Sequence, residues 1–403
     1  MSWYSEEFIK KIPKTDLHVH LDGSLRIPTL IDLAKKHKIE LPSYTEEGLR
    51  ELVFKKSYKN LDEYLKGFAY TCAVMRDIDS IKQISYELAY DSFNEGVRYI
   101  EVRFAPQLLM NEKLDFEMIV KAADDGLRQA RDEINQNVPE DEPEFDYGII
   151  ICAMRFCNEN FSPFYKSFFN LHKYSTQRET IKLASLEAAK AAVFLRKNTD
   201  IQVVGFDIAG SEYGNPADHH TDSYKFIHEN FLHKTVHAGE AFGPESIFLA
   251  ITALHADRIG HGLFLFNESM ITNEDISDKK RYIEDLVTYI ADRRITIEVC
   301  LSSNLQTVPG IKEIKNHSLR KMLENKLSVT FCTDNRLVSS TTVSKELKLA
   351  LDNFPISQRQ LKDILVYGFK RSFYYKPYPK KREYVRKVIN YYEKLENEFL
   401  SKV

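Results

Sequence analysis

Two histidines lie two residues apart in a segment that alternates polar and apolar residues, from Asp16 to Asp22. On a β-strand, a period of two sends the side chains of His18 and His20 to the same side. One buried histidine is usually a hydrogen-bonded core residue, but two stacked imidazoles at the end of a strand gain nothing from an apolar core. The pair therefore indicates a metal site, and its remaining ligands should follow later strands.

Later apolar runs end in side chains of the types that complete such a site. His237 ends one run, His261 lies at the end of another, and Asp334 follows a third. Taken singly, His261 is explained as a hydrogen-bonded core residue and Asp334 as the N-cap of a helix. Their coincidence at several strand ends instead favours metal binding, because three imidazoles and a carboxylate suit a borderline divalent ion such as zinc.

Eight short apolar runs, rich in β-branched residues and separated by helical patterns, must position these side chains. Runs that are apolar on both faces suit parallel strands covered by helices. Eight such units predict an α/β fold, a closed (β/α)8 TIM barrel, whose functional side chains gather at the carboxyl ends of the strands. The runs are Thr15–His20, Val97–Phe104, Tyr147–Met154, Gln202–Ile208, Lys234–His237, Arg258–Gly262, Thr296–Leu301 and Ser328–Thr333.

Three helices between or after these runs have clear signals. Asn60 with Glu63 three residues later predicts a capping box at the start of a helix that continues to Cys72. Thr180–Lys197 has a broad apolar side at helical spacing. The segment after Pro379 places its apolar residues on one stripe, so we expect it to pack on the outside of the barrel.

The stretch from about residue 25 to residue 95 is much longer than one crossover helix requires. It follows the carboxyl end of the first strand, where barrel active sites form, so we expect extra helices there that form a wall or lid of the pocket. No repeat and no linker rich in glycine and serine interrupts the chain. We therefore expect a single domain over residues 1–403, with further extra helices at the C-terminus.

Composition and charge limit the class of protein. With 43% hydrophobic residues the chain can bury a core, and its 56 Lys and Arg stand against 59 Asp and Glu, a net charge of −3. Without a basic excess, binding to nucleic acid or to an anionic membrane is disfavoured. No apolar run is long enough to span a bilayer. The five scattered cysteines and the absence of a secretory signal predict reduced thiols in a cytoplasmic protein.

Six short segments carry or flank these candidate residues: Asp16–Ser24 (DLHVHLDGS), Glu101–Pro106 (EVRFAP), Asp207–Gly210 (DIAG), Val236–Glu240 (VHAGE), Arg258–Gly262 (RIGHG) and Thr333–Asn335 (TDN). In their content and order they resemble the motif set of the adenosine deaminase family, within the amidohydrolase superfamily. Each motif is weak alone, whereas the ordered set is specific. The resemblance extends from residue 16 to residue 335 and implies the same barrel fold.

The resemblance implies a zinc site. The ligands of one Zn²⁺ per chain would be the imidazoles of His18, His20 and His237 and the carboxylate of Asp334. Many amidohydrolases instead hold two metal ions bridged by a carboxylated lysine at the end of strand four. The fourth run continues to Gly210 without a lysine, so the sequence favours a single metal ion.

The implied reaction is attack of hydroxide on C6 of a purine, with loss of ammonia. Zinc lowers the pKa of a bound water from about 15.7 toward about 7. Glu240 would protonate purine N1 as a general acid, which requires a raised pKa, although alone it also fits an exposed glutamate in the first turn of a helix. His261 would orient the water or stabilise the alkoxide, and Asp334 would accept a proton of the water.

The resemblance also places His20, Asp22, Gly210 and Asn335 against the substrate. The Gly210 backbone would contact purine N3 and Asp22 the ribose hydroxyls, although Gly210 alone fits a turn and Asp22 a helix N-cap. Asn335 stands where many relatives have an aspartate, and its amide would donate to N7 without a shifted pKa. Leu301 stands where relatives usually have proline, which leaves the shape of the loop after the seventh strand open.

The implied function is zinc-dependent hydrolysis of adenosine, and of 2′-deoxyadenosine, to inosine and ammonia in purine salvage. Deamination of a related aminopurine is the alternative: adenine, 5′-methylthioadenosine, AMP or an N6-alkyl nucleotide. An inactive nucleoside-binding scaffold is disfavoured, because Glu240, His261 and Asp334 are all present. We expect a small nucleoside as the partner, and the oligomeric state stays open. His219 and His220, adjacent in a polar loop, are not expected to form a second metal site.

Overall fold

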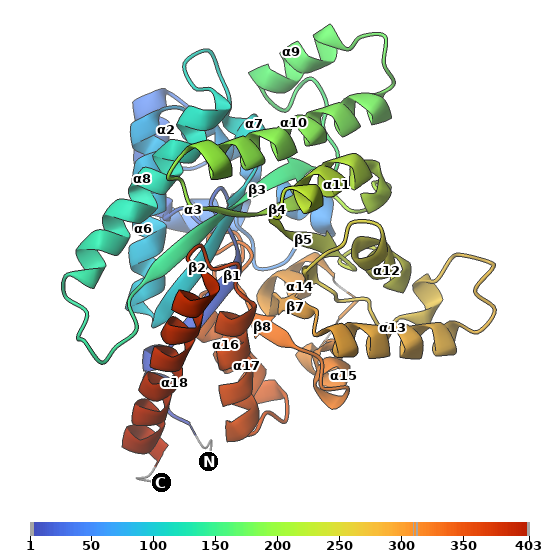
Figure 1. Ribbon diagram of the computed structural model, residues 1–403. Coiled ribbons are helices and arrows are strands. Elements are labelled where there is room, and N and C mark those ends of the chain that lie inside the picture. The colour runs from blue at the N-terminus through green and yellow to red at the C-terminus, as the bar shows by residue number, and fades with distance from the viewer. Residues whose placement is uncertain (1–3, 309, 312, 401–403) are drawn as a thin grey trace.

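Eight parallel strands form the centre of the described structure, and each pairs with the next in chain order (Figure 1). The computed structural model describes residues 4–308, 310–311 and 313–400. The strands are β1 (Lys14–His20), β2 (Val97–Phe104), β3 (Asp146–Met154), β4 (Val203–Ala209), β5 (His233–Ala238), β6 (Arg258–His261), β7 (Thr296–Val299) and β8 (Val329–Phe331). The chain after β8 returns to β1, because Asp334 N donates to His18 O at 2.8 Å. The predicted (β/α)8 barrel is confirmed.

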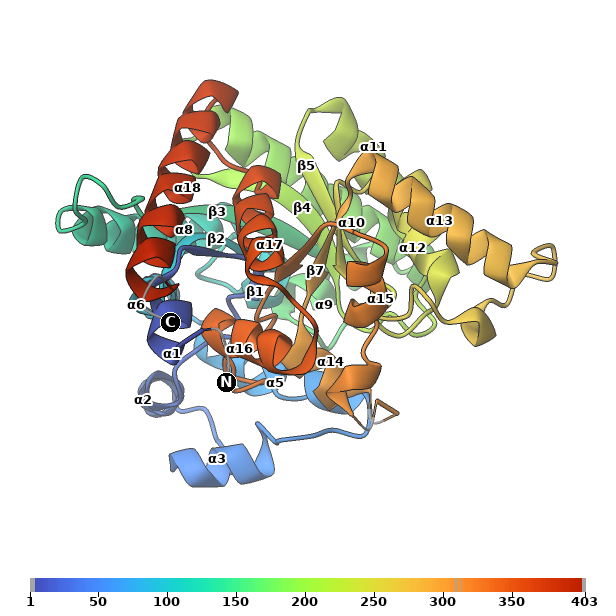
Figure 2. The same cartoon turned by 90° about the horizontal axis from the view of Figure 1, so that it is seen from below.

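Helices precede, connect and follow the strands (Figures 1 and 2). Before β2 lie α1 (Glu6–Lys11), α2 (Ile27–His37), α3 (Glu46–Leu52), α4 (Leu61–Leu65), α5 (Phe68–Val74) and α6 (Ile78–Asn94). Between β2 and β5 lie α7 (Pro106–Leu109), α8 (Phe116–Asn135), α9 (Pro163–Leu171), α10 (Gln177–Asn198), η1 (Ala217–His220) and α11 (Thr221–Glu229). Between β5 and β8 lie α12 (Pro244–Thr252), η2 (Glu268–Met270), α13 (Lys279–Arg293), α14 (Leu301–Thr307), η3 (Ile314–Asn316) and α15 (Leu319–Glu324). The chain then forms α16 (Val343–Asn353), α17 (Gln358–Arg371) and α18 (Tyr378–Leu400).

The extra helices predicted after the first strand are present, but one of them is divided. The predicted helix from Asn60 to Cys72 is two helices, α4 and α5, because the chain turns at Gly67. A β-carbon at Gly67 would lie 3.3 Å from Phe54 Cε1, so the turn packs closely. The predicted capping box is also incomplete. The Asn60 side chain accepts from Glu63 N, but the Glu63 carboxylate accepts from Lys59 N rather than from the backbone of Asn60.

The other two predicted helices are confirmed. Thr180–Lys197 lies within α10, whose N-cap Thr176 forms a full capping box with Glu179. The C-terminal stripe forms α18, which packs beside α17 on the outside of the barrel (Figure 2). Tyr384 of α18 is buried and donates its hydroxyl hydrogen bond to Arg98 O at 2.8 Å. These contacts join the end of the chain to β2.

The strand predicted over Thr296–Leu301 is too long. β7 ends at Val299, and Leu301 is instead the buried first residue of α14. Helix α14 begins there because the buried Glu346 carboxylate of α16 accepts a hydrogen bond from Ser302 N at 3.1 Å. That contact satisfies one of the backbone N–H groups that a helix start leaves unpaired. Leu301 therefore starts a helix and does not extend the strand.

Glu346→Gln should change how stability depends on pH. Burial raises the pKa of Glu346 to about 7, against about 4.3 in an unfolded chain. Between these two pKa values Glu346 is protonated in the folded state and ionised in the unfolded state. Folding therefore takes up a proton, and the stability that this protonation gives is lost as the pH rises toward 7. The free energy of unfolding of the wild type should therefore fall relative to that of the variant, by at most about 4 kcal/mol. Urea unfolding at several pH values measures this difference, which the exposed control Glu324→Gln should not show.

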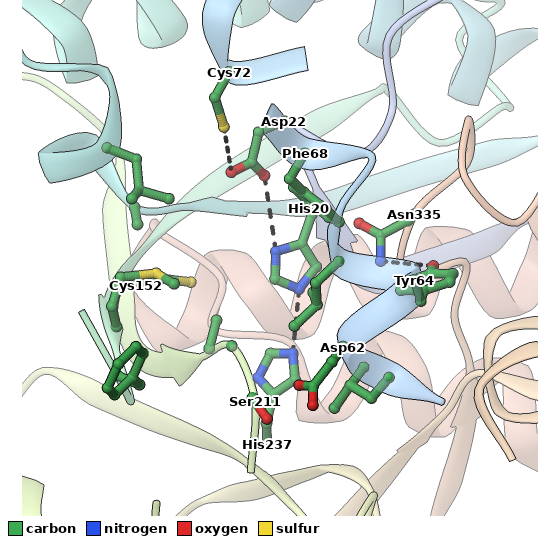
Figure 3. A pocket seen from close by; sticks show the side chains of 18 of the residues that line it. His20, Asp22, Asp62, Tyr64, Phe68, Cys72, Cys152, Ser211, His237 and Asn335 are labelled. Atoms are coloured by element: carbon green, nitrogen blue, oxygen red, sulfur yellow. Dashed lines mark hydrogen bonds and ion pairs between the residues drawn. The ribbon is translucent and has the colours of Figure 1, made fainter. Parts of the chain in front are cut away.

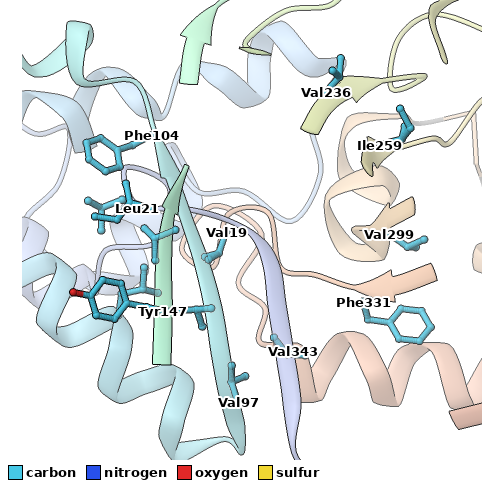
Figure 4. Packing of buried hydrophobic residues seen from close by; sticks show 14 of the residues in the cluster. Val19, Leu21, Val97, Phe104, Tyr147, Val236, Ile259, Val299, Phe331 and Val343 are labelled. Carbon is cyan, nitrogen blue, oxygen red and sulfur yellow. The ribbon is translucent and has the colours of Figure 1, made fainter. Parts of the chain in front are cut away.

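Apolar side chains pack between the strands and the surrounding helices, as Val19, Val97 and Tyr147 do in Figure 4. The interior of the barrel differs, because charged side chains such as Arg103 and Glu298 are fully buried there. All five cysteines are free thiols. Among the described residues, every helix is too short or too polar to cross a membrane.

Candidate active site

A cavity of about 450 Å³ opens at the carboxyl ends of the strands (Figure 3). Its size falls within the range of small-molecule sites, and its walls include residues of α4 and α5. The structure brings every predicted site residue into this cavity except His18, which is fully buried beside it. The predicted site residues among those that line it are His20, Asp22, Gly210, His237, Glu240, His261, Asp334 and Asn335.

Four buried side chains converge at one point of the cavity wall. One ligand-type atom of each of His18, His20, His237 and Asp334 lies within 4.8 Å of the others. The Nε2 atoms of His20 and His237 are 3.2 Å apart, and Asp334 Oδ1 is 3.4 Å from Nε2 of both His18 and His20. His18 Nε2 is buried without a hydrogen-bond partner. This set of three imidazoles and a carboxylate fits Zn²⁺, which takes four ligands of these types.

Buried carboxylates contact two of these imidazoles at Nδ1. His18 Nδ1 lies 2.8 Å from Glu298 Oε2, and His237 Nδ1 lies 2.9 Å from Asp207 Oδ2. A carboxylate at Nδ1 favours the tautomer with the proton there, which leaves the lone pair of Nε2 for a metal ion. Sequence reasoning missed Glu298. The signal that marks it is a carboxylate within the otherwise apolar run Thr296–Val299.

Two arginines neutralise these carboxylates inside the barrel. Arg103 donates to Asp207 Oδ2 at 2.7 Å and to Glu298 Oε2 at 3.0 Å, and Arg258 donates to Glu298 Oε1 at 2.6 Å. Burial alone would raise the pKa of Glu298, but Arg103 and Arg258 hold it well below its ordinary value. Removing one partner of a buried ion pair costs about 3–5 kcal/mol, because the other charge stays unpaired. The network therefore keeps Glu298 ionised and in place.

Glu240 lies on the loop between β5 and α12. It is buried in the cavity and precedes the first helical residue, Pro244, so it is not an exposed first-turn glutamate. Burial raises the pKa of Glu240 well above its ordinary value, and the charges of Asp334 and Glu212 raise it further. A raised pKa favours the protonated carboxyl, which is the form that a general acid requires.

A second buried carboxylate, Glu212, holds the loop that carries Glu240. It accepts hydrogen bonds from the four successive backbone N–H groups of residues 239–242, at 3.0, 2.9, 2.6 and 3.0 Å. Gly239 has a φ of +72°, and a β-carbon there would lie 2.6 Å from Ile247 Cδ1. Sequence reasoning missed Glu212. Its signal is an acidic residue shortly after the fourth strand, at the end where the site forms.

Two site residues have a left-handed backbone: His261 with φ +65° and Asp334 with φ +58°. Residues other than glycine rarely adopt this backbone region, which costs about 1–3 kcal/mol for each residue. His261 Nε2 lies 3.7 Å from Glu240 Oε1, and Asp334 Oδ2 accepts a hydrogen bond from Ser303 Oγ at 2.6 Å. Asp334 caps no helix, since the N-cap of α16 is Thr342. Specific polar contacts therefore hold both side chains at the cavity.

The residues expected to contact the substrate line the same cavity, and Figure 3 shows His20, Asp22 and Asn335 among them. Asp22 is buried 3.9 Å from Cys72 Sγ, and burial raises its pKa to about 7. Gly210 has a φ of +98°, so its backbone requires glycine at this point. Asn335 Nδ2 donates to Tyr64 Oη at 2.9 Å, while Asn335 Oδ1 is buried without a partner. One N–H of the Asn335 amide therefore already donates to a side chain of α4.

The adjacent histidines His219 and His220 lie apart from this cluster. They are in η1, where His220 is buried with its Nδ1 2.8 Å from Ser185 Oγ. His219 Nε2 lies 3.8 Å from the carboxylate of Asp218. Within the described residues, the group that fits a metal ion contains neither of them.

The adenosine deaminase family model matches residues 13–391. The chain is 30% identical over 368 residues to a probable adenosine deaminase of Dictyostelium discoideum, covering 91% of this chain but 41% of that protein. It is 32% identical over 400 residues to adenosine deaminase 1 of Streptomyces coelicolor, covering 98% of this chain and 91% of that protein. An amidohydrolase structure from Burkholderia ambifaria with bound Zn has the same fold, with a TM-score of 0.75, 18% identity and coverage of 99% and 95%. The chain therefore belongs to the adenosine deaminase family, a metal-dependent family of hydrolases that act on carbon–nitrogen bonds.

Proposed function

We propose that this protein hydrolyses adenosine, and 2′-deoxyadenosine, to inosine and ammonia with one Zn²⁺ per chain. The observation that carries the proposal is the buried carboxyl of Glu240, which lines the same cavity as the convergent imidazoles and carboxylate. A hydrolytic deaminase needs both parts, an acid for the ring nitrogen and a metal site for the water. An inactive scaffold would require neither.

The proposed zinc ligands are His18, His20, His237 and Asp334. A zinc ion there would supply a water with a pKa lowered from about 15.7 toward about 7. The fourth strand and the residues after it, through Gly210, contain no lysine that could bridge a second ion. This supports one metal ion per chain rather than two.

The catalytic side chains divide the proton transfers. Glu240 donates its proton to purine N1 while the oxygen of water adds to C6, and Asp334 accepts one proton of that water. His261 stabilises the oxygen on C6. The amino group leaves as ammonia with the proton from Asp334, and the proton of the new C6 hydroxyl returns to Glu240. The two hydrogens of water thus end on ammonia and on Glu240, and N1 keeps the proton that Glu240 first gave.

The lining of the cavity favours a nucleoside over a nucleotide. Among the described residues that line it there is no lysine and no arginine, whereas Asp22 and Asp62 contribute carboxylates. A phosphate would therefore have no cationic partner. Apolar side chains such as Phe68 offer a surface for the flat purine. We assign the ribose hydroxyls to Asp22 and purine N3 to the backbone of Gly210, with His20 beside the reacting carbon.

A panel of aminopurines tests this proposal. The value of kcat/KM for adenosine should exceed that for AMP by at least about 10²-fold, or about 2.7 kcal/mol, because the described lining offers the phosphate no cationic side chain. Adenine should also be poorer, since it lacks the ribose that Asp22 would bind. The fall in purine absorbance measures each rate. If AMP, an N6-alkyl nucleotide or adenine were the best substrate, the assignment to adenosine would be wrong.

Removing purine N7 should reveal the role of Asn335. If the Asn335 amide donates to N7, 7-deazaadenosine should have a kcat/KM about tenfold below that of adenosine, the value of one hydrogen bond. Asn335→Ala should abolish this discrimination. Asn160→Ala, a change of the same type elsewhere in the cavity lining, should preserve it. Equal turnover of both nucleosides by the wild type would show that Asn335 contributes no binding energy through N7.

We further propose that residues 1–403 form one domain, in which the helices between β1 and β2 act as the wall or lid of the pocket. Leu61, Tyr64 and Phe68 line the cavity from α4 and α5, which supports this role. The five free thiols suit a cytoplasmic enzyme. A place in purine salvage follows from the proposed substrate and product.

A further inference from the structure

A second cavity, of about 750 Å³, lies at the opposite end of the barrel from the active site. Its walls are the start of β5, the segments before β6 and β7, the ends of α12, α13 and α17, and the start of α18. Three histidines line it, together with six lysines and arginines: Lys234, Arg293, Arg294, Lys370, Arg371 and Lys381. The function proposed above uses none of these residues.

The positive charge of this cavity is mostly uncompensated. Asp257 is the single acidic residue among the described lining residues, and it already lies 3.3 Å from Lys234 Nζ and 3.7 Å from His233 Nδ1. Within the described residues, the other five lysines and arginines have no carboxylate at ion-pair distance. Arg371 Nε is buried without a hydrogen-bond partner. Like charges around one cavity repel each other, and a bound anion would offset this repulsion.

Helix ends explain part of this pattern. Arg293 is the last residue of α13 and Arg371 the last of α17, and cations are favoured at helix C-termini. That effect does not account for Lys234, which is buried at the start of β5, or for Lys381 on α18. The preference for cations at helix ends also does not explain why basic side chains from separate elements line one cavity. The convergence is therefore the feature that points to a ligand.

We propose that this cavity binds a small molecule carrying two or more phosphate groups. Arginine side chains bind phosphate oxygens through paired N–H donors, and three arginines line this cavity. The volume is that of a small-molecule site. A nucleic acid fits less well, because the chain as a whole has a net charge of −3. The phosphate chemistry is shared by sugar bisphosphates and nucleoside triphosphates.

Calorimetric titration of the full zinc-loaded chain tests the proposal. Fructose 1,6-bisphosphate and CTP are the two probes, since CTP offers no purine to the active site, and inorganic phosphate is the reference. At low ionic strength we expect saturable binding of at least one probe to one site per chain, at least tenfold tighter than inorganic phosphate. The tighter probe distinguishes a sugar phosphate from a nucleotide source.

Paired variants complete the test. Arg293→Gln with Lys370→Gln should weaken binding of the tighter probe at least tenfold without changing adenosine turnover. Lys121→Gln with Lys190→Gln removes the same charge from exposed helix positions and should leave binding unchanged. Absence of saturable binding, or equal weakening by both pairs, would overturn the proposal. Neither result bears on the deaminase function.

A chain of hydrogen bonds carries a second, independent inference. The backbone N–H of Leu319 can only donate, and it donates to His317 Nδ1 at 3.0 Å. Burial lowers the pKa of His317 to about 4, so its one ring proton lies on Nε2, which donates to Asn304 Oδ1 at 3.1 Å. Asn304 Nδ2 must then donate to His261 Nδ1, at 3.1 Å. The proton of His261 therefore lies on Nε2, the atom nearest Glu240.

We infer that Asn304 and His317 are positioning residues that fix His261 as the Nε2–H tautomer. In the proposed function, on which this inference rests, that N–H would donate to the oxygen developing on C6. A fixed donor already aimed at the new charge needs no reorganisation during the reaction. The opposite tautomer would present a lone pair to that oxygen and oppose its formation.

Asn304→Asp keeps the shape of the side chain and reverses its polarity. A carboxylate only accepts, so the proton of His261 should move to Nδ1, and kcat should fall about 10²-fold with KM changed less than about threefold. His317→Gln, which keeps an N–H donor, should retain most of the wild-type kcat. Histidine ¹⁵N shifts of the substrate-free protein report the tautomer directly. Unchanged shifts or unchanged kcat in Asn304→Asp would overturn the inference, whereas a wild type with the expected shifts but no adenosine turnover would refute only the proposed function.

Discussion

Glu240→Gln should lower kcat for adenosine by about 10³-fold, within the range that a general acid contributes. Glutamine has nearly the same shape and retains the backbone contacts of the loop with Glu212, but it cannot give a proton to purine N1. Zinc content and KM should stay close to those of the wild type, because Glu240 is not among the proposed ligands. Steady-state rates and metal analysis of the same preparation measure both expectations.

The role of Glu240 as an acid also predicts how activity depends on pH. The reactive form of Glu240 is the protonated one, and burial with the nearby charges of Asp334 and Glu212 raises its pKa well above the ordinary value. Activity should therefore decline as the pH rises through that raised pKa. Glu229→Gln, an exposed change of the same type on α11, should leave both rate and profile intact. A Glu240→Gln enzyme with wild-type kcat would remove Glu240 from the mechanism.

The sequence predicted the positions that depend on strand ends. His18 and His20 lie in a segment with a period of two, and His237 ends an apolar run. Parallel strands in a barrel bring their carboxyl ends to one face. Asp334 was predicted from the same rule, and its contact with β1 follows from barrel closure. The ligand-type residues could therefore be placed near each other without knowing a single distance.

Residues that act on these side chains from outside the cavity were harder to predict. Glu298 binds His18 across the barrel, 280 positions along the chain, and its buried charge is tolerated because of Arg103 and Arg258. Sequence patterns describe what an element exposes or buries, but they do not report which distant charge compensates another. Asn304 illustrates the same limit, since its helix begins inside the predicted seventh strand.

The start of that helix also depends on a distant partner. Local apolar character favoured a strand through Leu301, because nothing in the run itself interrupts it. The carboxylate of Glu346, more than forty residues later, satisfies Ser302 N and allows α14 to begin. Tertiary contact thus decided between two local conformations that the sequence alone leaves comparable.

Removal of the proposed zinc should abolish turnover and lower the thermal midpoint, and both should return in proportion to added Zn²⁺ up to one equivalent. Turnover should fall to below about 1% of its initial value, because the water then loses its pKa shift toward about 7. Stability should fall because an ion that binds only the folded state favours it by mass action. Dialysis against a chelator, followed by stepwise zinc addition with both readouts, measures the stoichiometry.

A matched pair of histidine variants separates loss of the site from loss of the fold. His20→Ala removes one of the four ligands and should leave less than about one tenth of the wild-type zinc content, since zinc prefers four filled positions. His219→Ala changes a histidine that lies outside the cluster and should keep one zinc and full turnover. A second equivalent of tightly bound zinc in the wild type, lost in His219→Ala, would contradict the single-ion assignment. Full zinc content in a folded His20→Ala protein would show that the convergence of these imidazoles is structural, and that the cavity performs its chemistry with a different set of ligands.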